Sequence, residues 1–566
     1  MQEFLDEDET DIRWKVVVIN EDGIKANDGK EIYLVDHAWT FRPQTARQHL
    51  ETIAGLLERM VGLFDLGQDE SSSTSSPNEK EELIDKVMDE KWKYCSSYSL
   101  GSADTIEERM PIFYVLDEFG HRINHQDHGY NFRLVPFVYV PEGCAYSLLF
   151  PIKDALFEDE VTRDYLEGPE AAQDDEMRKA LLNIWSKHDM QYIDWKQVEP
   201  EMDFFTSSRT NETVVEDPDF QAECLPTNRK IKVFTQYENI ARNLSHSRFE
   251  IVATEEEADI VWLTHHFKQF KELAAESPMK RINQFPFEHV FTIKDLLCIV
   301  CRRMRQGDHN DPEWLPTTFN MKTELCKFVS HFQYREDQGL DNHWIVKPWN
   351  LARGLDMHVS KSLSQILKHS LAGVPKIVQK YLHHPVLFER PEIGKVKFDI
   401  RYILLLRSIK PLKVYAYNRF WLRLANEKFE LNKYDVYEKH FTVMNYNEAP
   451  LEKLLCEDFI AKFENQHPEH NWNDQVQKKI FKMFRQVFEG ACALEPPQGI
   501  AHNSQSRAMY ACDLMLNWED QGQMVPKILE INWGPDCDRA CDYYPEFFND
   551  IFSTLYLDEP VNVTLL

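Results

Sequence analysis

Long apolar runs are missing from this sequence of 566 residues. No stretch approaches the roughly 20 apolar residues that a membrane-spanning helix requires, which argues against an integral membrane protein. The first segment, MQEFLDEDETDIRWK, is acidic and has no apolar signal core. A secretory or mitochondrial address is therefore not expected, and we predict a cytoplasmic protein.

Excess positive charge is also missing. The formal net charge is −30, which argues against direct binding of nucleic acid, because phosphate contacts need a basic surface. The eleven cysteines are scattered and odd in number, as in a reduced protein without a disulfide framework. Cys298 and Cys301 form a CxxC within an apolar helical segment, and Cys537 lies close to Cys541; buried thiols explain both pairs better than zinc.

The length predicts two to four domains, and a hydrophobic content of 43% excludes a mainly disordered chain. Residues 1–200 read as β-rich with flanking helices, including one amphipathic helix over 45–64. Residues 69–82 have the composition of a disordered loop, and 201–229 that of an irregular linker. From residue 230 short buried strands alternate with helical segments, which predicts an α/β region extending to residue 566.

The segment VPKILEINWGP (525–535) ends an apolar strand with an acid and an amide two positions apart. Side chains alternate across a strand, so Glu530 and Asn532 point to the same face. They are either solvated residues of a half-exposed strand or hard oxygen ligands for Mg²⁺. The preceding strand can bring Asp513 beside them.

A second strand, GKVKFDIRYILLLR, places Lys397, Asp399 and Arg401 on one face. Alternating charges on such an apolar strand are costly to bury without a role. A structural ladder of salt bridges is one interpretation; a site for a polyanion such as a phosphate chain is favoured. Lys347 at a strand end and Lys380 in KIVQKYL are weaker candidates for phosphate contacts.

Together these segments resemble the ATP-grasp domain of the tubulin tyrosine ligase-like family. IVKP, VQKYL, KFDIR, DLML and ILEIN occur in the family's order, and the resemblance covers roughly residues 230 to 557. It implies a ligase fold using ATP and Mg²⁺, with Asp513, Glu530 and Asn532 as metal ligands and Arg401 and Glu530 as catalytic residues. The implied nucleotide-binding residues are Lys347, Arg353, Gly354, Lys380, Tyr381, Leu382, Lys397, Asp399 and Arg401.

In the family's chemistry ATP phosphorylates a carboxylate and an amine then attacks the acyl phosphate, while metal ions neutralise the phosphoryl oxygens. Three departures place this transfer in doubt. Asp356 replaces a glycine of the phosphate loop, where we expect its charge to oppose phosphate. Asn418 stands where the family has an arginine, and Val443 where it has an asparagine.

The N-terminal segment resembles a SET domain. EDEVTRDYLEG (158–168) is similar to the SET motif GEELTFDYG, and RINHQDHGYN (122–131) to FINHSCxPN. The match implies that Asn124, His125 and Tyr165 take the positions that bind S-adenosylmethionine. Glu158 replaces a glycine, and the cysteine and proline of the second motif are missing, so an ordinary β-rich domain remains the alternative.

Three functions follow: a pseudo-ligase that binds Mg·ATP and tubulin and regulates modification, an active ligase, or a SET-type methyltransferase. Residues 395–430 contain nine Lys or Arg against three Asp or Glu, which predicts a groove for an acidic tail such as that of tubulin. The resemblances add histone as a second partner, and nuclear and microtubule-associated locations. Oligomeric state is not predicted.

Overall fold

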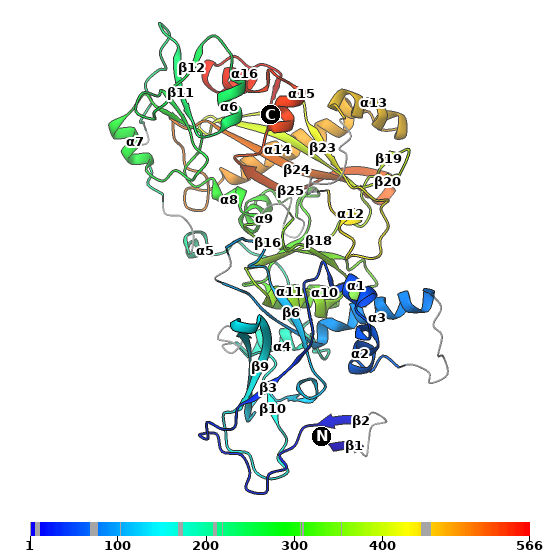
Figure 1. Ribbon diagram of the computed structural model, residues 1–566. Helices are drawn as coiled ribbons and strands as arrows, with labels where there is room; N and C mark the ends of the chain where they lie inside the picture. Colours follow the sequence, from blue (N-terminus) through cyan, green and yellow to red (C-terminus); the bar gives the residue numbers. More distant parts are fainter. Residues whose placement is uncertain are drawn as a thin grey trace. The chain divides into compact units, whose positions relative to one another are not determined.

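The computed structural model describes residues 2–5, 12–67, 77–101, 104–167, 174–207, 212–217, 219–305, 307, 311–351, 354–442 and 454–566. The chain forms two compact units (Figure 1). Unit 1 contains residues 1–195, 320–348 and 356–378, and unit 2 contains residues 196–319, 349–355 and 379–566. The domain boundaries predicted at 200 and 230 stay predictions. None of the helices in these described ranges has the length and apolarity that crossing a membrane requires.

Unit 1 begins with the β-rich region that the sequence predicts. Two antiparallel sheets have the strand orders β3-β9-β8 and β4-β6-β5, and a further sheet has the order β15-β18-β16-β17. The strands are β1 (Gln2–Leu5), β2 (Ile12–Lys15), β3 (Tyr33–Val35), β4 (His37–Phe41), β5 (Cys95–Tyr98), β6 (Ile112–Leu116), β7 (Asn124–His125), β8 (Phe132–Tyr139), β9 (Cys144–Pro151), β10 (Thr162–Arg163), β16 (Trp344–Pro348) and β17 (His358–Ser360), with β15 (Thr318–Asn320) and β18 (Lys376–Lys380) crossing the unit boundary. The helices are α1 (Ala46–Thr52), α2 (Leu56–Leu63), α3 (Pro77–Tyr94), α4 (Asp175–Leu182), α10 (Leu325–Asp337) and α11 (Leu363–Leu371).

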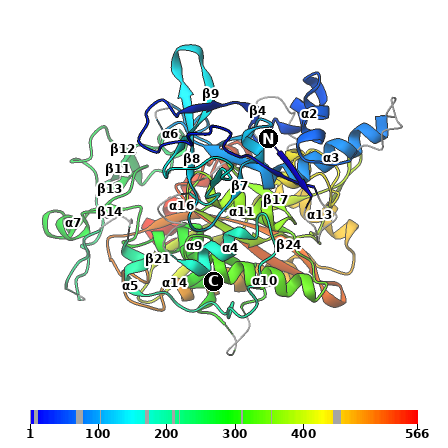
Figure 2. The ribbon, with the colours of Figure 1, turned by 90° about the horizontal axis from the view of Figure 1, so that it is seen from below.

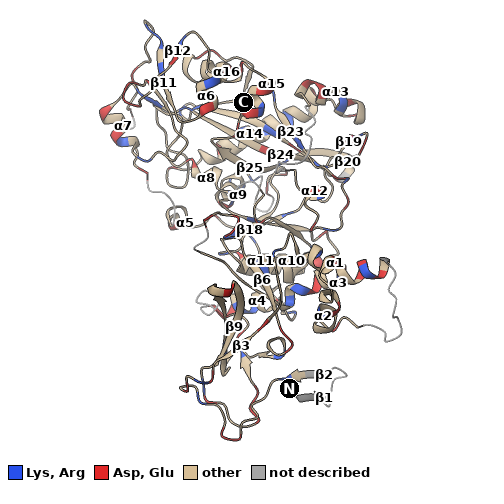
Figure 3. Ribbon diagram, in the orientation of Figure 1, with Lys and Arg blue, Asp and Glu red and all other residues tan. Residues whose placement is uncertain are grey.

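Two local predictions in unit 1 need correction. The single helix expected over 45–64 is broken into α1 and α2 at Gly55, which has a φ of +77°. α1 ends at Thr52, because Ile53 takes an extended conformation, and the left-handed Gly55, a conformation that favours glycine, then precedes α2. The loop expected over 69–82 is helical from Pro77 onward, where α3 carries both signs of charge along its length (Figure 3). Residues 69–76 lie outside the described ranges.

Unit 2 contains the predicted α/β region. A parallel sheet of order β12-β11-β13-β14 is followed by a six-stranded antiparallel sheet of order β25-β24-β21-β22-β26, in which β23 also pairs with β21. The strands are β11 (Ile231–Thr235), β12 (Phe249–Ile251), β13 (Ile260–Trp262), β14 (Arg281–Ile282), β19 (Phe388–Arg390), β20 (Gly394–Val396), β21 (Phe398–Ser408), β22 (Lys413–Tyr417), β23 (Trp421–Leu424), β24 (Ala508–Glu519), β25 (Gln523–Trp533) and β26 (Val563–Leu565). The helices are α5 (Met202–Thr206), α6 (Glu238–Asn243), α7 (Phe270–Glu276), α8 (His289–Thr292), α9 (Lys294–Arg302), α12 (Tyr437–His440), α13 (Cys456–Gln466), α14 (Gln477–Ala491), α15 (Asp538–Tyr543) and α16 (Phe547–Phe552).

The central strand β21 is buried on both faces. Tyr402 and Leu404 belong to a core with α9, α13 and α14, whereas Ile403 and Leu405 belong to a second core with α15 and α16. Figure 2 shows α9 and α14 close to β21. Successive side chains of a strand point to opposite faces, and helices cover each face here, so a near-continuous apolar run suits this strand. The charged residues at the start of β21 therefore lie beside a rigid core.

Candidate functional site

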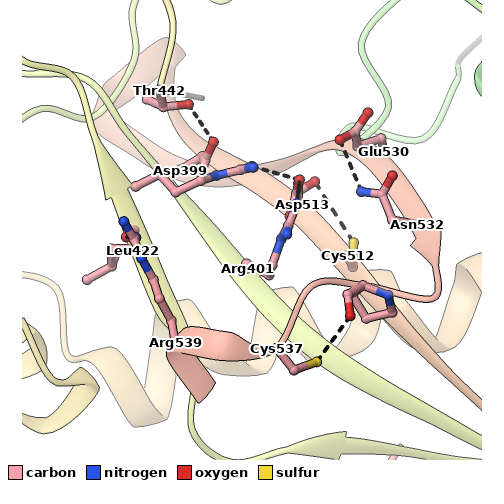
Figure 4. A network of polar contacts seen from close by, with 12 residues as sticks. Asp399, Arg401, Leu422, Thr442, Cys512, Asp513, Glu530, Asn532, Cys537 and Arg539 are labelled. Atoms are coloured by element: carbon pink, nitrogen blue, oxygen red, sulfur yellow. Dashed lines mark hydrogen bonds and ion pairs between the residues drawn. The ribbon is translucent and has the colours of Figure 1, made fainter. Parts of the chain in front are cut away.

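The paired strands β24 and β25 bring together the acid and amide side chains that the sequence singled out. Asp513 lies directly opposite Glu530 in the register, and Ala511 lies opposite Asn532. The side-chain amide of Asn532 donates to Glu530 Oε1 at 3.0 Å (Figure 4). The predicted juxtaposition of Asp513, Glu530 and Asn532 is thus confirmed, because alternation along β25 and pairing with β24 place all three on one face.

A chain of ion pairs runs from β21 through the site. Arg401 donates through Nε and Nη2 to the two carboxylate oxygens of Asp513, each at 2.7 Å. Arg423, on β23, donates to Asp513 Oδ2 at 2.7 Å and to Asp399 Oδ1 at 2.8 Å. Thr442 donates its hydroxyl to the other oxygen of Asp399. Both carboxylates are almost fully buried, and burial raises the pKa of Asp399 although Arg423 opposes the shift.

Arg423 was not among the predicted site residues. The signal for it was an arginine within the apolar segment FWLRLA, which is costly to bury without partners. Cross-strand pairing explains its place: Arg423 lies opposite Asp399, and Arg401 lies opposite Asp513. The alternating charges of KFDIR therefore form, in part, the ladder of salt bridges that the sequence left as the alternative.

Lys294 is a second residue that the sequence interpretation missed. It is the first residue of α9, and its ammonium lies 2.9 Å from Glu530 Oε2 and donates to the main-chain oxygen of Leu351 at 2.9 Å. Burial alone would raise the pKa of Glu530, but Lys294, with the Asn532 hydrogen bond and Arg423, holds it well below its usual range. Glu530 is therefore a carboxylate with its own counter-ion.

The donor set fits Mg²⁺ in its chemistry, since two carboxylates and an amide are the hard oxygen ligands that this ion prefers. The charge of the site, however, is already balanced within the chain. The carboxylates of the site are Asp399, Asp513 and Glu530. The side-chain cations paired with them are Arg401, Arg423 and Lys294. A metal ion at Asp513 and Glu530 would compete with these cations for the carboxylate oxygens.

Most of the other predicted nucleotide-binding residues lie at the end of β18, directly after it, or directly before β21. Lys397 is buried and donates to Tyr381 Oη at 2.9 Å and to the main-chain oxygen of His440 at 3.2 Å. Lys380 donates to the main-chain oxygen of Tyr381 at 3.3 Å, and Leu382 is buried beside them. All of these residues belong to unit 2.

The remaining predicted nucleotide-binding residues are Lys347, Arg353 and Gly354. Lys347 lies on β16 of unit 1 and is buried, and Arg353 lies outside the described residues. Gly354 has a φ of +69°, and a Cβ there would lie 2.5 Å from Tyr437 Oη. Only glycine fits this position without displacing the tyrosine.

Asp356 does not act as the free opposing charge that the sequence suggested. In unit 1 its carboxylate lies 2.9 Å from the ammonium of Lys376 and 2.9 Å from His358 Nε2. Ligand atoms of Asp356, His358 and His369 lie within 4.8 Å of one another, but Lys376 already supplies the counter-charge. The prediction that Asp356 repels phosphate was wrong in this respect, because its charge is paired and buried.

Asn418 is tied to the C-terminal strand. Its Oδ1 accepts a hydrogen bond of 2.6 Å from the hydroxyl of Thr564, and its main-chain N–H donates to the oxygen of Asn562. Neither interaction supplies the positive charge of the arginine found in the family. Val443, the third departure, lies outside the described residues.

The two SET-like motifs of unit 1 lie side by side, because β7 and β10 pair in parallel with Asn124 opposite Thr162. Tyr165 donates its hydroxyl to the main-chain oxygen of Ile123 at 2.9 Å, and its main-chain N–H donates to His125 Nδ1. The Asn124 amide donates to the main-chain oxygen of Trp14 and to the Glu160 carboxylate. The three candidate residues are thus engaged in contacts within the domain.

Comparison with known proteins matches both halves of the chain. Residues 272–564 match the model of the tubulin-tyrosine ligase family, and residues 6–189 match the tubulin tyrosine ligase SET-like domain. Human tubulin–tyrosine ligase-like protein 12 is 45% identical over 97% of this chain and 83% of its own length. The chain belongs to the tubulin-tyrosine ligase family.

Two further relatives are less similar to this chain. The Caenorhabditis elegans tubulin–tyrosine ligase-like protein 12 is 38% identical over 95% of this chain. A probable tubulin polyglutamylase of mouse, TTLL2, is 26% identical over 54% of this chain and 56% of its own length. The family is of the ATP-grasp ligase type and generally depends on ATP and Mg²⁺, so the expected fold and family are confirmed.

Proposed function

We propose that this protein is a pseudo-ligase, which binds Mg·ATP and tubulin and regulates tubulin modification without transferring an amino acid itself. The observation that carries the proposal is the neutralisation of the two metal-ligand carboxylates. Asp513 is held by Arg401 and Arg423, and Glu530 is held by Lys294. Asn418 in place of an arginine supports the same conclusion for the transfer step. The location that goes with this role is the cytoplasm, in part on microtubules.

In this proposal, nucleotide binding replaces carboxylate partners of the site's arginines by phosphate oxygens. Phosphate oxygens offer Arg401 and Arg423 an alternative to Asp513, and the released carboxylate can then take a metal ion. Positive charge from Lys397 and Lys380 adds to the attraction for phosphate. The residues that ground-state binding of Mg·ATP requires are therefore present. Breaking the ion pairs with Asp513, however, lowers the affinity for the nucleotide.

The nucleotide proposal predicts a thermal shift with Mg·ATP in the full-length protein. A ligand at 100 times its dissociation constant stabilises the folded state by about 2.7 kcal/mol. Glu530→Gln should diminish the shift because it weakens a metal ligand. Lys294→Met should change it in the opposite direction, since it leaves Glu530 without a competing cation, so Mg²⁺ then stabilises the variant more than the wild type.

Differential scanning fluorimetry with Mg·ATP, and with ATP and EDTA, measures both effects. No shift at millimolar Mg·ATP would mean that the nucleotide site is vestigial. Equal Mg²⁺ responses in Lys294→Met and the wild type would show that Glu530 is only a structural ion-pair partner.

Tubulin is proposed as the partner because similar proteins carry the names tubulin polyglutamylase and tubulin glycylase. The positions of the basic residues in 395–430 reduce the number of residues that could contact an acidic tail. Lys397, Arg401 and Arg423 are engaged inside the site, whereas Lys410 and Lys413 lie at the turn between β21 and β22. Lys410 is 65% exposed in its pair with Glu495. This turn is the better candidate for contact with an acidic tail.

Reversing the charge at Lys410 and Lys413 to Glu should weaken co-sedimentation with microtubules and reduce its dependence on salt. The matched control reverses Lys230 and Lys478, which are exposed elsewhere in unit 2. Equal binding by both double variants would place the tubulin contact elsewhere. Histone is left out of the proposal, because Asn124 and Tyr165 are bound within the SET-like domain.

The active-ligase hypothesis retains one supporting observation. The complete set of oxygen donors is in place, with Asp513 opposite Glu530 and Asn532 on the same face. Amino-acid transfer, described in the Discussion, decides between the two.

A further inference from the structure

Three arginines converge at the end of β21 that lies away from the candidate site. Leu406 on β21 pairs with Ala508 on β24, so continuing this register places Arg407 opposite Arg507. Ile282, beside Arg281 on β14, forms a parallel β-bridge with Ser506. The main-chain N–H of Arg507 donates to the main-chain oxygen of Ile282 at 2.9 Å. Arg407 follows Arg401 by six positions along the strand, a distance of roughly 20 Å.

The positive charge of this arginine cluster, which we define as Arg281, Arg407 and Arg507, is largely uncompensated. The Arg281 guanidinium donates to main-chain oxygens of Met279 and Glu223, and that of Arg507 donates to main-chain oxygens of Ser504 and Ser506. These acceptors are neutral. Within the described part of the chain, the cluster forms one ion pair with a carboxylate: Arg407 with Asp558, at 3.0 Å.

The cluster is also poorly solvated. Arg281 is only 6% exposed. Burial, together with the charges of Arg407 and Arg281, lowers the pKa of Arg507 to about 9. Like charges opposite each other on neighbouring strands destabilise a sheet, and a buried charge without a partner costs several kcal/mol. Arg281 is therefore a buried cation beside two half-buried arginines, Arg407 and Arg507, and this arrangement favours a compensating anion.

A buried hydroxyl points to the same place. Tyr556 is 8% exposed, and its Oη has no hydrogen-bond partner among the described residues. Burial raises the pKa of Tyr556, and the charges of Arg507 and Arg281 oppose that shift. The hydroxyl thus lies within the field of both guanidinium groups and is free to donate.

We propose that Arg281, Arg407 and Arg507, with the Tyr556 hydroxyl, bind a small oxyanion of the phosphate class. Guanidinium groups match the geometry of phosphate oxygens with paired N–H donors, and the buried tyrosine supplies one more. The burial of Arg281 and Tyr556 favours a single phosphate group, free or at the end of a small molecule, over an extended peptide. This site lies apart from the predicted ATP site and does not depend on pseudo-ligase function.

The test is thermal stabilisation of the full-length protein by inorganic phosphate and by pyrophosphate, at constant ionic strength against chloride. We expect a concentration-dependent rise in melting temperature. Arg507→Met should weaken the apparent affinity about tenfold or more, because it removes charge-assisted hydrogen bonds. It should also raise the melting temperature without phosphate, since it relieves repulsion within the cluster.

Two further variants keep the test decisive if Arg507→Met does not fold. Asp558→Asn removes the one carboxylate paired with the cluster, and its side chain is 62% exposed, so the fold should persist and phosphate should bind more tightly than in the wild type. Arg248→Met is the matched control: its guanidinium also donates to two main-chain oxygens, of Thr227 and Pro226, and its phosphate response should equal that of the wild type.

A phosphate response that pyrophosphate does not share would assign the site to free phosphate, and a stronger pyrophosphate response would assign it to a terminal phosphate of a larger molecule. The absence of any response in the wild type would overturn the proposal. So would an unchanged response in both Arg507→Met and Asp558→Asn.

Discussion

Replacing Arg423 by Met is expected to destabilise unit 2 by about 3–5 kcal/mol, because breaking a buried ion pair leaves an uncompensated charge. Arg423 bridges Asp399 and Asp513, and each of these carboxylates is 1% exposed. Arg401 would still pair with Asp513, but among the described residues Asp399 would keep only the Thr442 hydroxyl. Chemical denaturation of the full-length protein, followed by circular dichroism, measures the loss.

Arg242→Met is the matched control for this substitution. Arg242 pairs with Glu238 on the surface of α6, with the two side chains 66% and 73% exposed, and exposed pairs contribute at most about 1 kcal/mol. Adding Asp399→Asn to Arg423→Met should recover part of the lost stability, because it removes the stranded charge. Equal effects of Arg423→Met and Arg242→Met would show that the network is not a buried ionic structure.

Periodicity in the sequence was sufficient to place the oxygen donors. Alternation along a strand puts Glu530 and Asn532 on one face, and a polar loop between two strands predicts that Asp513 lies near them. Both inferences are local, involving neighbouring residues or one hairpin. The order of the motifs then predicted the family and the mixed fold.

Counter-ions could not be placed in the same way. Lys294 pairs with Glu530 across a large separation in sequence, and no spacing rule connects the start of α9 to the end of β25. Asp356 illustrates the opposite error. Its position in a phosphate-loop motif suggested repulsion of nucleotide, but the charge is paired with Lys376, which the sequence does not place beside it.

Wild-type protein is expected to transfer no amino acid to tubulin. By the sequence resemblance Asn418 stands where the family has an arginine, and its side chain accepts from Thr564 and carries no charge. Loss of an arginine that stabilises a phosphoryl transition state can slow transfer by roughly 10³-fold or more. The ion pair between Lys294 and Glu530 adds to the barrier in this proposal, because Lys294 competes with a metal ion for the Glu530 carboxylate. Incorporation of labelled amino acid measures the outcome.

The pseudo-ligase proposal is tested most directly by incorporation of labelled tyrosine, glutamate or glycine into purified tubulin, with Mg·ATP and full-length protein. An active tubulin polyglutamylase serves as the positive control, and Glu530→Gln shows whether any signal depends on the candidate site. We predict no incorporation above background by the wild type, with Mg·ATP binding measured on the same preparation. Incorporation by the wild type that Glu530→Gln abolishes would contradict the proposal and establish an active ligase.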